Sequence, residues 1–339
     1  LEIKQIVMKK NLIVVFASLL LFVSCGGGRA TVPVTKTVVP TAQTDIPTFN
    51  ADSAYSYVKA QTDFGPRVPN TKAHKECAHW LEQKLKSFGA ETTVQNIQVT
   101  TFDGTLINGY NIVGQINPES NKRIILCAHW DSRPWADNDP NPANHKKPVD
   151  GANDGASGVG VILEIARQLQ IKAPAIGIDF IFFDAEDWGP GDSYKGRSLP
   201  EHWGLGSQYW SRRPHKDGYM ARYAVLLDMV GGKGARFYRE GISNHYAKSI
   251  VDKYWEAAGL TGNRAMFPLE DGGFVTDDHY FINSIAHIPA IDIVPYLPEC
   301  KESSFGPTWH TINDNIDNID KATLQAVGET VLYVIYNEK

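Results

Sequence analysis

Four dense apolar runs constrain the fold of this chain more than any other feature. They lie at 123–128, 177–183, 223–227 and 290–294. Runs of this kind are typical of strands that are buried on both faces of a parallel sheet. Helical patterns lie between and after them, at 158–169, 243–258 and 322–336. Strands that alternate with helices predict a mainly parallel sheet with helices on both faces.

The segment before these runs predicts two further helices and a hairpin. Apolar residues recur at helical intervals in 52–62 and 72–88, and Gly89 ends the second pattern. Residues 92–101 and 107–116 alternate between polar and apolar side chains, as half-buried strands do. We therefore expect an α/β fold with a mixed, mainly parallel twisted sheet, flanked by helices and carrying an antiparallel hairpin at one edge.

The composition fits one large folded domain and argues against nucleic-acid binding. The chain has 339 residues, of which 42% are hydrophobic, so a single domain over 49–339 can bury a full core. The formal net charge is −5, whereas proteins that bind nucleic acid favour basic patches. We expect no nucleic-acid partner.

The N-terminal segment predicts export. Lys9 and Lys10 precede an apolar run at 12–23, which is typical of a signal peptide and too short to span a membrane comfortably. Cys25 follows the small residue Ser24 and resembles the cysteine of a bacterial lipoprotein box. We expect a signal peptide at 1–25 and a Thr- and Pro-rich tether at 26–48.

The expected location follows from that segment. If Cys25 carries a lipid, the protein is held at a membrane surface, in the periplasm of a Gram-negative bacterium. Ordinary signal cleavage near Ser24 is the alternative. The other cysteines, Cys77, Cys127 and Cys300, are an odd number and cannot staple the fold with more than one disulfide.

Acids and histidines follow the apolar runs in a regular way. They are His129 and Asp131, Asp154, Glu186 and Asp187, Asp228, and, in a later segment, His310. The carboxyl ends of parallel strands meet at one edge of a sheet, where ligands bind. Carboxylates and imidazoles without paired cysteines are typical of a zinc enzyme with an open coordination position.

Each of these signals has an ordinary structural explanation when taken alone. Asp154 could cap the helix that follows it. Glu186 and Asp187 could form a solvated acidic turn, and His310 could pack against Trp309. The order in which the signals occur carries more information than any one of them.

That order resembles the M28 family of zinc exopeptidases and, within it, the glutaminyl cyclases. The motifs are AHWDS, DGANDGASGV, FFDAED, LLDM, TDDH and WHT. The resemblance implies that Asp154, Asp187 and His310 hold one zinc ion per chain and that Glu186 is the general acid/base. It also implies a network of hydrogen bonds that joins Asp228 and Asp277 to Glu186.

The same resemblance leaves two activities open. A glutaminyl cyclase converts the N-terminal glutamine of a peptide to pyroglutamate and releases ammonia. A di-zinc aminopeptidase would use His129 and Asp228 for a second metal and remove N-terminal residues. A receptor-like member that binds no metal is a third possibility, which the intact ligand set disfavours.

Three features favour the cyclase. Phe305 and Trp309 occupy the positions of the cyclases' Phe-x-x-x-Trp-His, whose aromatic side chains frame the substrate pocket. Asp277 begins an acidic pair before a histidine. Aromatic residues are also enriched, at Trp130, Trp135, Trp188 and Trp203.

Asp187 departs from the glutamate of animal cyclases, so its turn must approach the metal more closely. The Gly- and Pro-rich segment 188–210 is expected to form a loop over the site.

Overall fold

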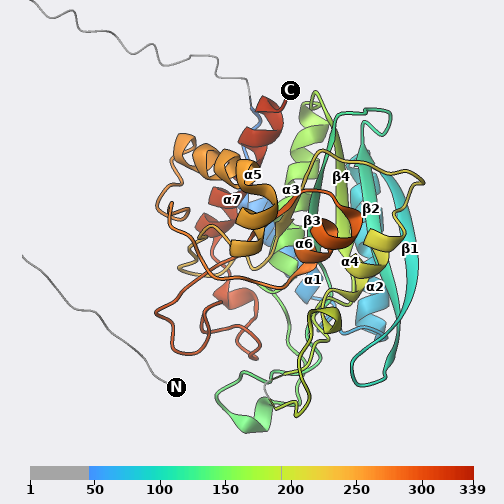
Figure 1. The fold of residues 1–339 in the computed structure, drawn as a ribbon, viewed down its shortest axis with the longest axis vertical. Coiled ribbons are helices and arrows are strands. Elements are labelled where there is room, and N and C mark those ends of the chain that lie inside the picture. The colour runs from blue at the N-terminus through green and yellow to red at the C-terminus, as the bar shows by residue number, and fades with distance from the viewer. Residues whose placement is uncertain (1–45, 192) are drawn as a thin grey trace, which may run out of the picture. The chain divides into compact units, whose positions relative to one another are not determined.

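The computed structural model describes residues 46–191 and 193–339 (Figure 1). In that part of the chain, six strands form one sheet in the order β1-β2-β4-β3-β5-β6. The strands are β1 Glu91–Thr100, β2 Leu106–Ile116, β3 Arg123–His129, β4 Gly177–Phe183, β5 Ala224–Leu227 and β6 Ala290–Ile293. β4, β3, β5 and β6 run parallel to one another, and β1 and β2 form an antiparallel hairpin whose β2 pairs antiparallel with β4. The predicted fold class is confirmed.

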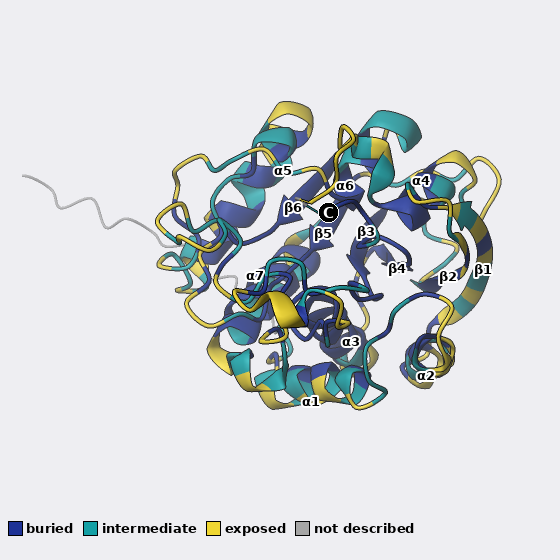
Figure 2. Ribbon diagram, turned by 90° about the horizontal axis from the view of Figure 1, so that it is seen from below, coloured by how far each residue is buried: buried dark blue, intermediate teal, exposed yellow. Residues whose placement is uncertain are grey.

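The apolar runs form the parallel strands because both of their faces are covered. Every residue of β3, β4, β5 and β6 is buried. Side chains alternate along a strand, so Leu126 of β3 faces one core and Cys127 faces the other. Figure 2 shows the buried strands at the centre of the molecule, with exposed residues on the outer helices and loops.

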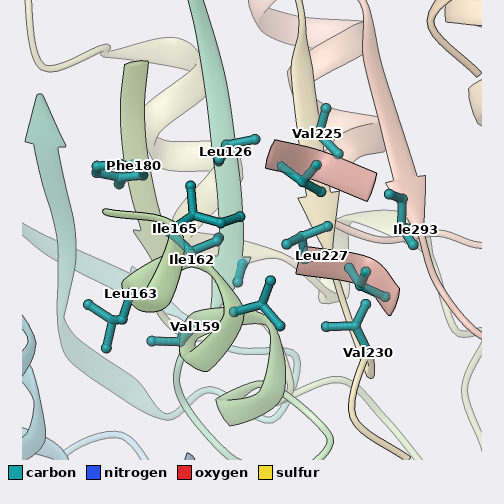
Figure 3. Packing of buried hydrophobic residues seen from close by; sticks show 14 of the residues in the cluster. Leu126, Val159, Ile162, Leu163, Ile165, Phe180, Val225, Leu227, Val230 and Ile293 are labelled. Atoms are coloured by element: carbon teal, nitrogen blue, oxygen red, sulfur yellow. The ribbon is translucent and has the colours of Figure 1, made fainter. Parts of the chain in front are cut away.

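The larger core lies between the sheet and a layer of helices. α3 Ala156–Ile171 packs on the sheet, and Val159 and Ile162 lie close to Leu126 and Leu227 (Figure 3). The remaining helices that contribute to this core are α1 Ala51–Thr62, α2 Lys72–Ser87, α5 Gly241–Leu260 and α7 Lys321–Asn337. All of the predicted helices and strands end within two residues of the observed ends.

Shorter helices cover the opposite face. α4 Leu205–Arg212 and α6 Asp278–Phe281 lie there, and Trp210 of α4 is fully buried in the second core. The expected loop at 188–210 is therefore wrong for its last residues, which belong to α4. The surrounding Gly and Ser residues hid the helix, which buries Trp210. Single-turn helices complete the fold at Pro142–Asn144, Pro200–His202, Ile282–Ala286 and Ile316–Asn318.

The N-terminal predictions fall outside this part of the chain. The signal peptide 1–25, its Cys25 and residues 26–45 of the tether are not among the described residues. Of the helices that the structure does describe, none combines the length and the apolar character needed to cross a membrane.

Candidate active site

The carboxyl ends of three parallel strands form the floor of the candidate site. His129 is the last residue of β3, Asp228 follows β5 directly, and Glu186 and Asp187 lie in the turn after β4. Asp154 arrives from the loop before α3. The parallel sheet places these ends on one edge and so brings together residues that are far apart in the sequence.

Two groups of buried ligand atoms share Asp154. His129, Asp154 and Asp228 form one group, and Asp154, Asp187 and His310 form the other, each with its atoms within 4.8 Å of one another. His310 Nε2 lies 3.3 Å from an oxygen of Asp187 and 3.8 Å from one of Asp154. His129 Nε2 lies 2.9 Å from Asp154 Oδ1 and 3.2 Å from Asp228 Oδ1.

The donors of the second group fit a zinc ion. Asp154, Asp187 and His310 are all buried, and carboxylate oxygens with an imidazole nitrogen are common zinc ligands. Two buried carboxylates this close repel one another unless a cation or a proton lies between them. Three protein ligands also leave a fourth position for a substrate, as catalytic zinc sites require.

Asp154 does not cap the helix that follows it. The N-cap of α3 is Gly155, which has φ +88° and no capping side chain. A Cβ at this position would lie 2.8 Å from His129 Cε1, so only glycine lets the loop approach the histidine. The helix-cap interpretation is therefore wrong, and the Asp154 side chain is free to face His129.

Two buried aspartates hold the backbone of the site. Asp131 accepts hydrogen bonds from the backbone N–H groups of Glu186 and Asp187, at 3.1 and 3.2 Å. Asp314 accepts in the same way from Asn153 and Asp154, at 2.7 and 3.0 Å. Sequence reasoning grouped Asp131 with the metal site, but neither ligand group among the described residues contains it.

The sequence analysis did not predict any role for Asp314. Its position shortly after His310 in the WHT segment was the only signal, and an isolated aspartate in a loop does not reveal a backbone contact. Burial and the charge of Asp154 raise the pKa of Asp314 to about 8.

Glu186 is a buried carboxyl group close to other acidic side chains. Burial and the charge of Asp277 raise its pKa well above the usual value. Burial raises the pKa of Asp228 to about 6, although its hydrogen bond with His129 favours the charged form. Burial and Asp228 raise the pKa of Asp277 to about 7. The structure thus places the three predicted catalytic acids close enough to influence one another.

The expected hydrogen-bond network takes a different form. Asp277 is the N-cap of α6 and accepts a hydrogen bond from the backbone of Asp278 at 2.5 Å. In the described part of the chain, no hydrogen bond joins the Glu186 side chain directly to Asp228 or Asp277. Their coupling is electrostatic, because carboxylates lack a donor until one of them is protonated.

The backbone around these acids adopts an uncommon conformation. Ala185, Met229 and His310 have φ values of 55°, 51° and 55°. This left-handed region is costly for residues with a Cβ and tends to occur at functional sites. Each of the three residues either belongs to the site or is adjacent to a site acid.

An aromatic cavity of about 350 Å³ lies against His310. The Trp309 ring stacks on the His310 ring with centroids 3.6 Å apart, and Trp203 lies nearly parallel to His310 at 6.4 Å. The other residues that line the cavity are Arg133, Asp137, Asn138, Pro190, Gly191, Tyr194, Gly196 and Ser198. The predicted position of Trp309 at the substrate pocket agrees with this geometry.

Phe305 has a different place from the one expected. It packs on Trp309 with centroids 5.2 Å apart but is not among the residues that line the cavity. It lines a separate cavity of about 80 Å³ and supports Trp309. Of the four other tryptophans that the sequence singled out, only Trp203 lines the main cavity, whereas Trp130 stacks on His74 in the interior.

Comparison with known proteins assigns the family. The model of peptidase family M28 matches residues 111–335, which include every acid and histidine of the two ligand groups. The chain belongs to peptidase family M28. The membership that the motif order indicated is confirmed.

Within the family, the chain is similar to solved glutaminyl cyclases and to a curated relative. The chain is 56% identical to glutaminyl cyclase of Bacteroides thetaiotaomicron bound to N-acetylhistamine, covering 87% of this chain and 100% of that one, with a TM-score of 0.85. A Zn-dependent exopeptidase from Parabacteroides distasonis is 52% identical, covering 86% and 100%, with a TM-score of 0.84. Glutaminyl-peptide cyclotransferase of Drosophila melanogaster is 24% identical over 289 residues, 76% of this chain and 73% of that protein. The resemblance to glutaminyl cyclases is confirmed.

Proposed function

We infer that this protein is a glutaminyl cyclase. It converts the N-terminal glutamine of peptides and proteins to pyroglutamate and releases ammonia. The observation that carries this conclusion is the 56% identity to a solved glutaminyl cyclase over the full length of that chain. The geometry of the site agrees, because the buried Glu186 precedes Asp187 of a zinc-type ligand group, and an aromatic cavity lies against His310 of the same group.

The ligand group supplies the electrophilic part of the reaction. We propose that Asp154, Asp187 and His310 hold one zinc ion per chain. When bound, zinc supplies a Lewis acid that polarises the γ-carbonyl group of the glutamine. Asp131 keeps Asp187 in place through its backbone, and Asp314 does the same for Asp154.

Glu186 moves the proton. As the α-amine nitrogen forms its bond to the γ-carbon, Glu186 accepts the proton that the amine loses. It then returns a proton to the γ-nitrogen as the carbon–nitrogen bond breaks and ammonia leaves. Burial, and next the charge of Asp277, raise the pKa of Glu186 above its usual value, which helps one carboxyl group both to hold a proton and to return it.

Trp309 and Trp203 hold the substrate in the cyclising conformation. Attack is intramolecular, so a compact arrangement of the glutamine side chain supplies much of the rate. Flat aromatic walls beside His310 restrict the side chain to such an arrangement. No water is consumed, and a second, water-activating metal at His129 and Asp228 is not required.

The activity is tested with two peptides that differ in their first residue. A glutamine-headed and a leucine-headed peptide are incubated separately with the zinc-loaded enzyme and followed by mass spectrometry. Loss of ammonia from the first peptide alone is the expected result. Shortening of either peptide by one residue would identify an aminopeptidase instead.

Metal content is tested independently. Elemental analysis should find one zinc per chain in the wild type and none in Asp187→Ala, because that change removes a ligand. Two metals per chain in the wild type would contradict the single-zinc proposal and direct attention to His129 and Asp228.

We further propose that the protein is exported to the periplasm of a Gram-negative bacterium and anchored to a membrane through a lipid on Cys25. The basic, apolar and cysteine-containing order of 8–25 supports this proposal. Metabolic labelling with a fatty acid should label the wild type and not Cys25→Ala. The Cys25→Ala protein should also appear in the soluble periplasmic fraction. An unlabelled wild type would contradict the anchor.

A further inference from the structure

Arg133 is a buried cation beside the ligand group. Its side chain is 1% exposed, and it lies in the segment that follows β3. A buried guanidinium is unfavourable unless its donors are paired. Arg133 directs its donors at two aspartates that come from different segments of the site, Asp137 and Asp187.

The first contact fixes the Asp187 turn. Arg133 Nη1 donates to Asp187 Oδ1 at 2.9 Å and to the backbone carbonyl oxygen of Asp187 at 3.2 Å. One nitrogen therefore holds both the side chain and the main chain of this residue. Asp187 has a short side chain, so the position of its backbone decides whether the carboxylate reaches the other ligands.

The second contact reaches His310 through Asp137. Arg133 Nε and Nη2 each donate to one oxygen of Asp137 at 2.7 Å, in the bidentate arrangement that guanidinium and carboxylate favour. Asp137 Oδ1 lies 3.6 Å from His310 Nδ1. A carboxylate on this side of the ring favours a proton on Nδ1 and leaves Nε2, which faces Asp187, available as a ligand.

The surroundings keep this arrangement rigid. The rings of Trp135 and Trp203 each lie 5.3 Å from the Arg133 guanidinium carbon. Gly191 lies so close to Asp137 that an added Cβ would be 1.8 Å from Asp137 Oδ2. With the Asp137 carboxylate in this position, the packing leaves room only for glycine at 191.

We propose that Arg133 and Asp137 are positioning residues for the zinc site. Together they orient two of its three ligands, Asp187 directly and His310 through Asp137. This inference rests on the proposed zinc-dependent function. It assigns Arg133 a role that a compact cation such as lysine cannot fill, because lysine lacks the planar fork that bridges two carboxylates.

The test compares two buried arginines of the same kind. Arg123 forms a similar bidentate pair with Asp179, but at the opposite end of β3 and β4. We would measure the zinc dissociation constant of Arg133→Lys and Arg123→Lys by competition with a chelator. Loss of a partner that orients a metal ligand typically weakens binding about ten- to hundredfold, and we expect that change in Arg133→Lys. Arg123→Lys should bind zinc as the wild type does, although it loses stability.

A second variant tests the His310 branch. Asp137→Asn removes the negative charge beside Nδ1 while keeping the shape of the side chain, and it too should weaken zinc binding. In the cobalt-substituted protein, the visible absorption bands should shift for Asp137→Asn and not for Arg123→Lys, because those bands report ligand orientation. If Arg133→Lys does not fold, Asp137→Asn decides the question.

Two results would overturn the proposal. One is a zinc affinity of Arg133→Lys, or of Asp137→Asn where Arg133→Lys does not fold, that equals the wild-type value. The other is an equal loss of affinity in Arg123→Lys, which would reveal a general effect of stability. The proposed activity is judged separately, by the wild-type reaction with the glutamine-headed peptide, so a failure of one conclusion is distinguishable from a failure of the other.

Discussion

The two ends of β3 and β4 differ in how their buried charges are paired. At the amino end, Arg123 donates to both oxygens of Asp179 at 2.5 and 2.6 Å. Gln115 and Tyr219 also donate to Asp179, so this buried carboxylate has an opposite charge beside it and further hydrogen bonds. The Arg123–Asp179 pair therefore balances its own charge without any ligand.

At the carboxyl end, negative charge exceeds positive charge. Asp154, Glu186, Asp228 and Asp277 crowd around His129, and burial raises the pKa of three of these acids. Both carboxylate oxygens of the buried Asp292, in β6, have no hydrogen-bond partner in the part of the chain that the structure describes. The comparison shows that one end of the sheet stabilises the fold, while the other needs a cation or protons from outside the chain.

The largest expected difference between the two ends is catalytic. Glu186→Gln removes the proposed acid/base group, so kcat should fall about a hundredfold to ten-thousandfold. Zinc content should stay at the wild-type level, because Glu186 is not in the ligand group. Steady-state kinetics and elemental analysis check both statements. An unchanged kcat would remove Glu186 from the acid/base role.

The same acid-to-amide change at the amino end should act on stability instead. Asp179→Asn leaves Arg123 buried without its counter-charge, and breaking a buried pair in this way costs about 3–5 kcal/mol. Urea unfolding measures the loss, and kcat of the folded protein should not change. A loss below about 1 kcal/mol, the range of exposed ion pairs, would contradict the view that this end stabilises the fold.

Dependence on pH sharpens the contrast further. The raised pKa values of Asp228 and Asp277 mean that the folded protein keeps protons which an unfolded chain releases near pH 4. The free energy of unfolding of the zinc-free protein should therefore fall, by on the order of a few kcal/mol, as the pH rises from about 4 to about 7.

Zinc should reduce that fall, since it binds the deprotonated carboxylates and only the folded state assembles them. Urea unfolding at several pH values, with and without a chelator, provides the measurement. If the zinc-free protein gains stability over the same range, the carboxyl end does not carry surplus negative charge.

The smallest expected effect lies at the cavity wall. Trp309→Ala removes the ring that stacks on His310, and KM for a glutamine-headed peptide should rise about tenfold, which corresponds to about 1.4 kcal/mol. Phe305→Ala is the matched variant, because Phe305 supports Trp309 without lining the cavity. It should change KM less. An unaltered KM in Trp309→Ala would contradict its role as a wall.

Local patterns in the sequence were sufficient for most of the fold. The apolar run at 177–183 coincides with β4, and the helical pattern at 72–88 ends one residue after α2. These elements follow from the period of their side chains, which neighbouring residues determine. α4 escaped detection because its residues stand among Gly and Ser and its burial depends on a distant partner, Phe183, on which Trp210 packs.

The sequence by itself determined which residue types reach the carboxyl edge of the sheet and, through the order of the motifs, the family. Only the tertiary structure decided how they are held. Arg133 between Asp137 and Asp187, Asp131 under the Glu186 turn, and Asp314 under Asp154 all join distant segments. Such contacts leave no periodic trace, because they depend on where packed strands and loops meet rather than on the spacing of residues along the chain.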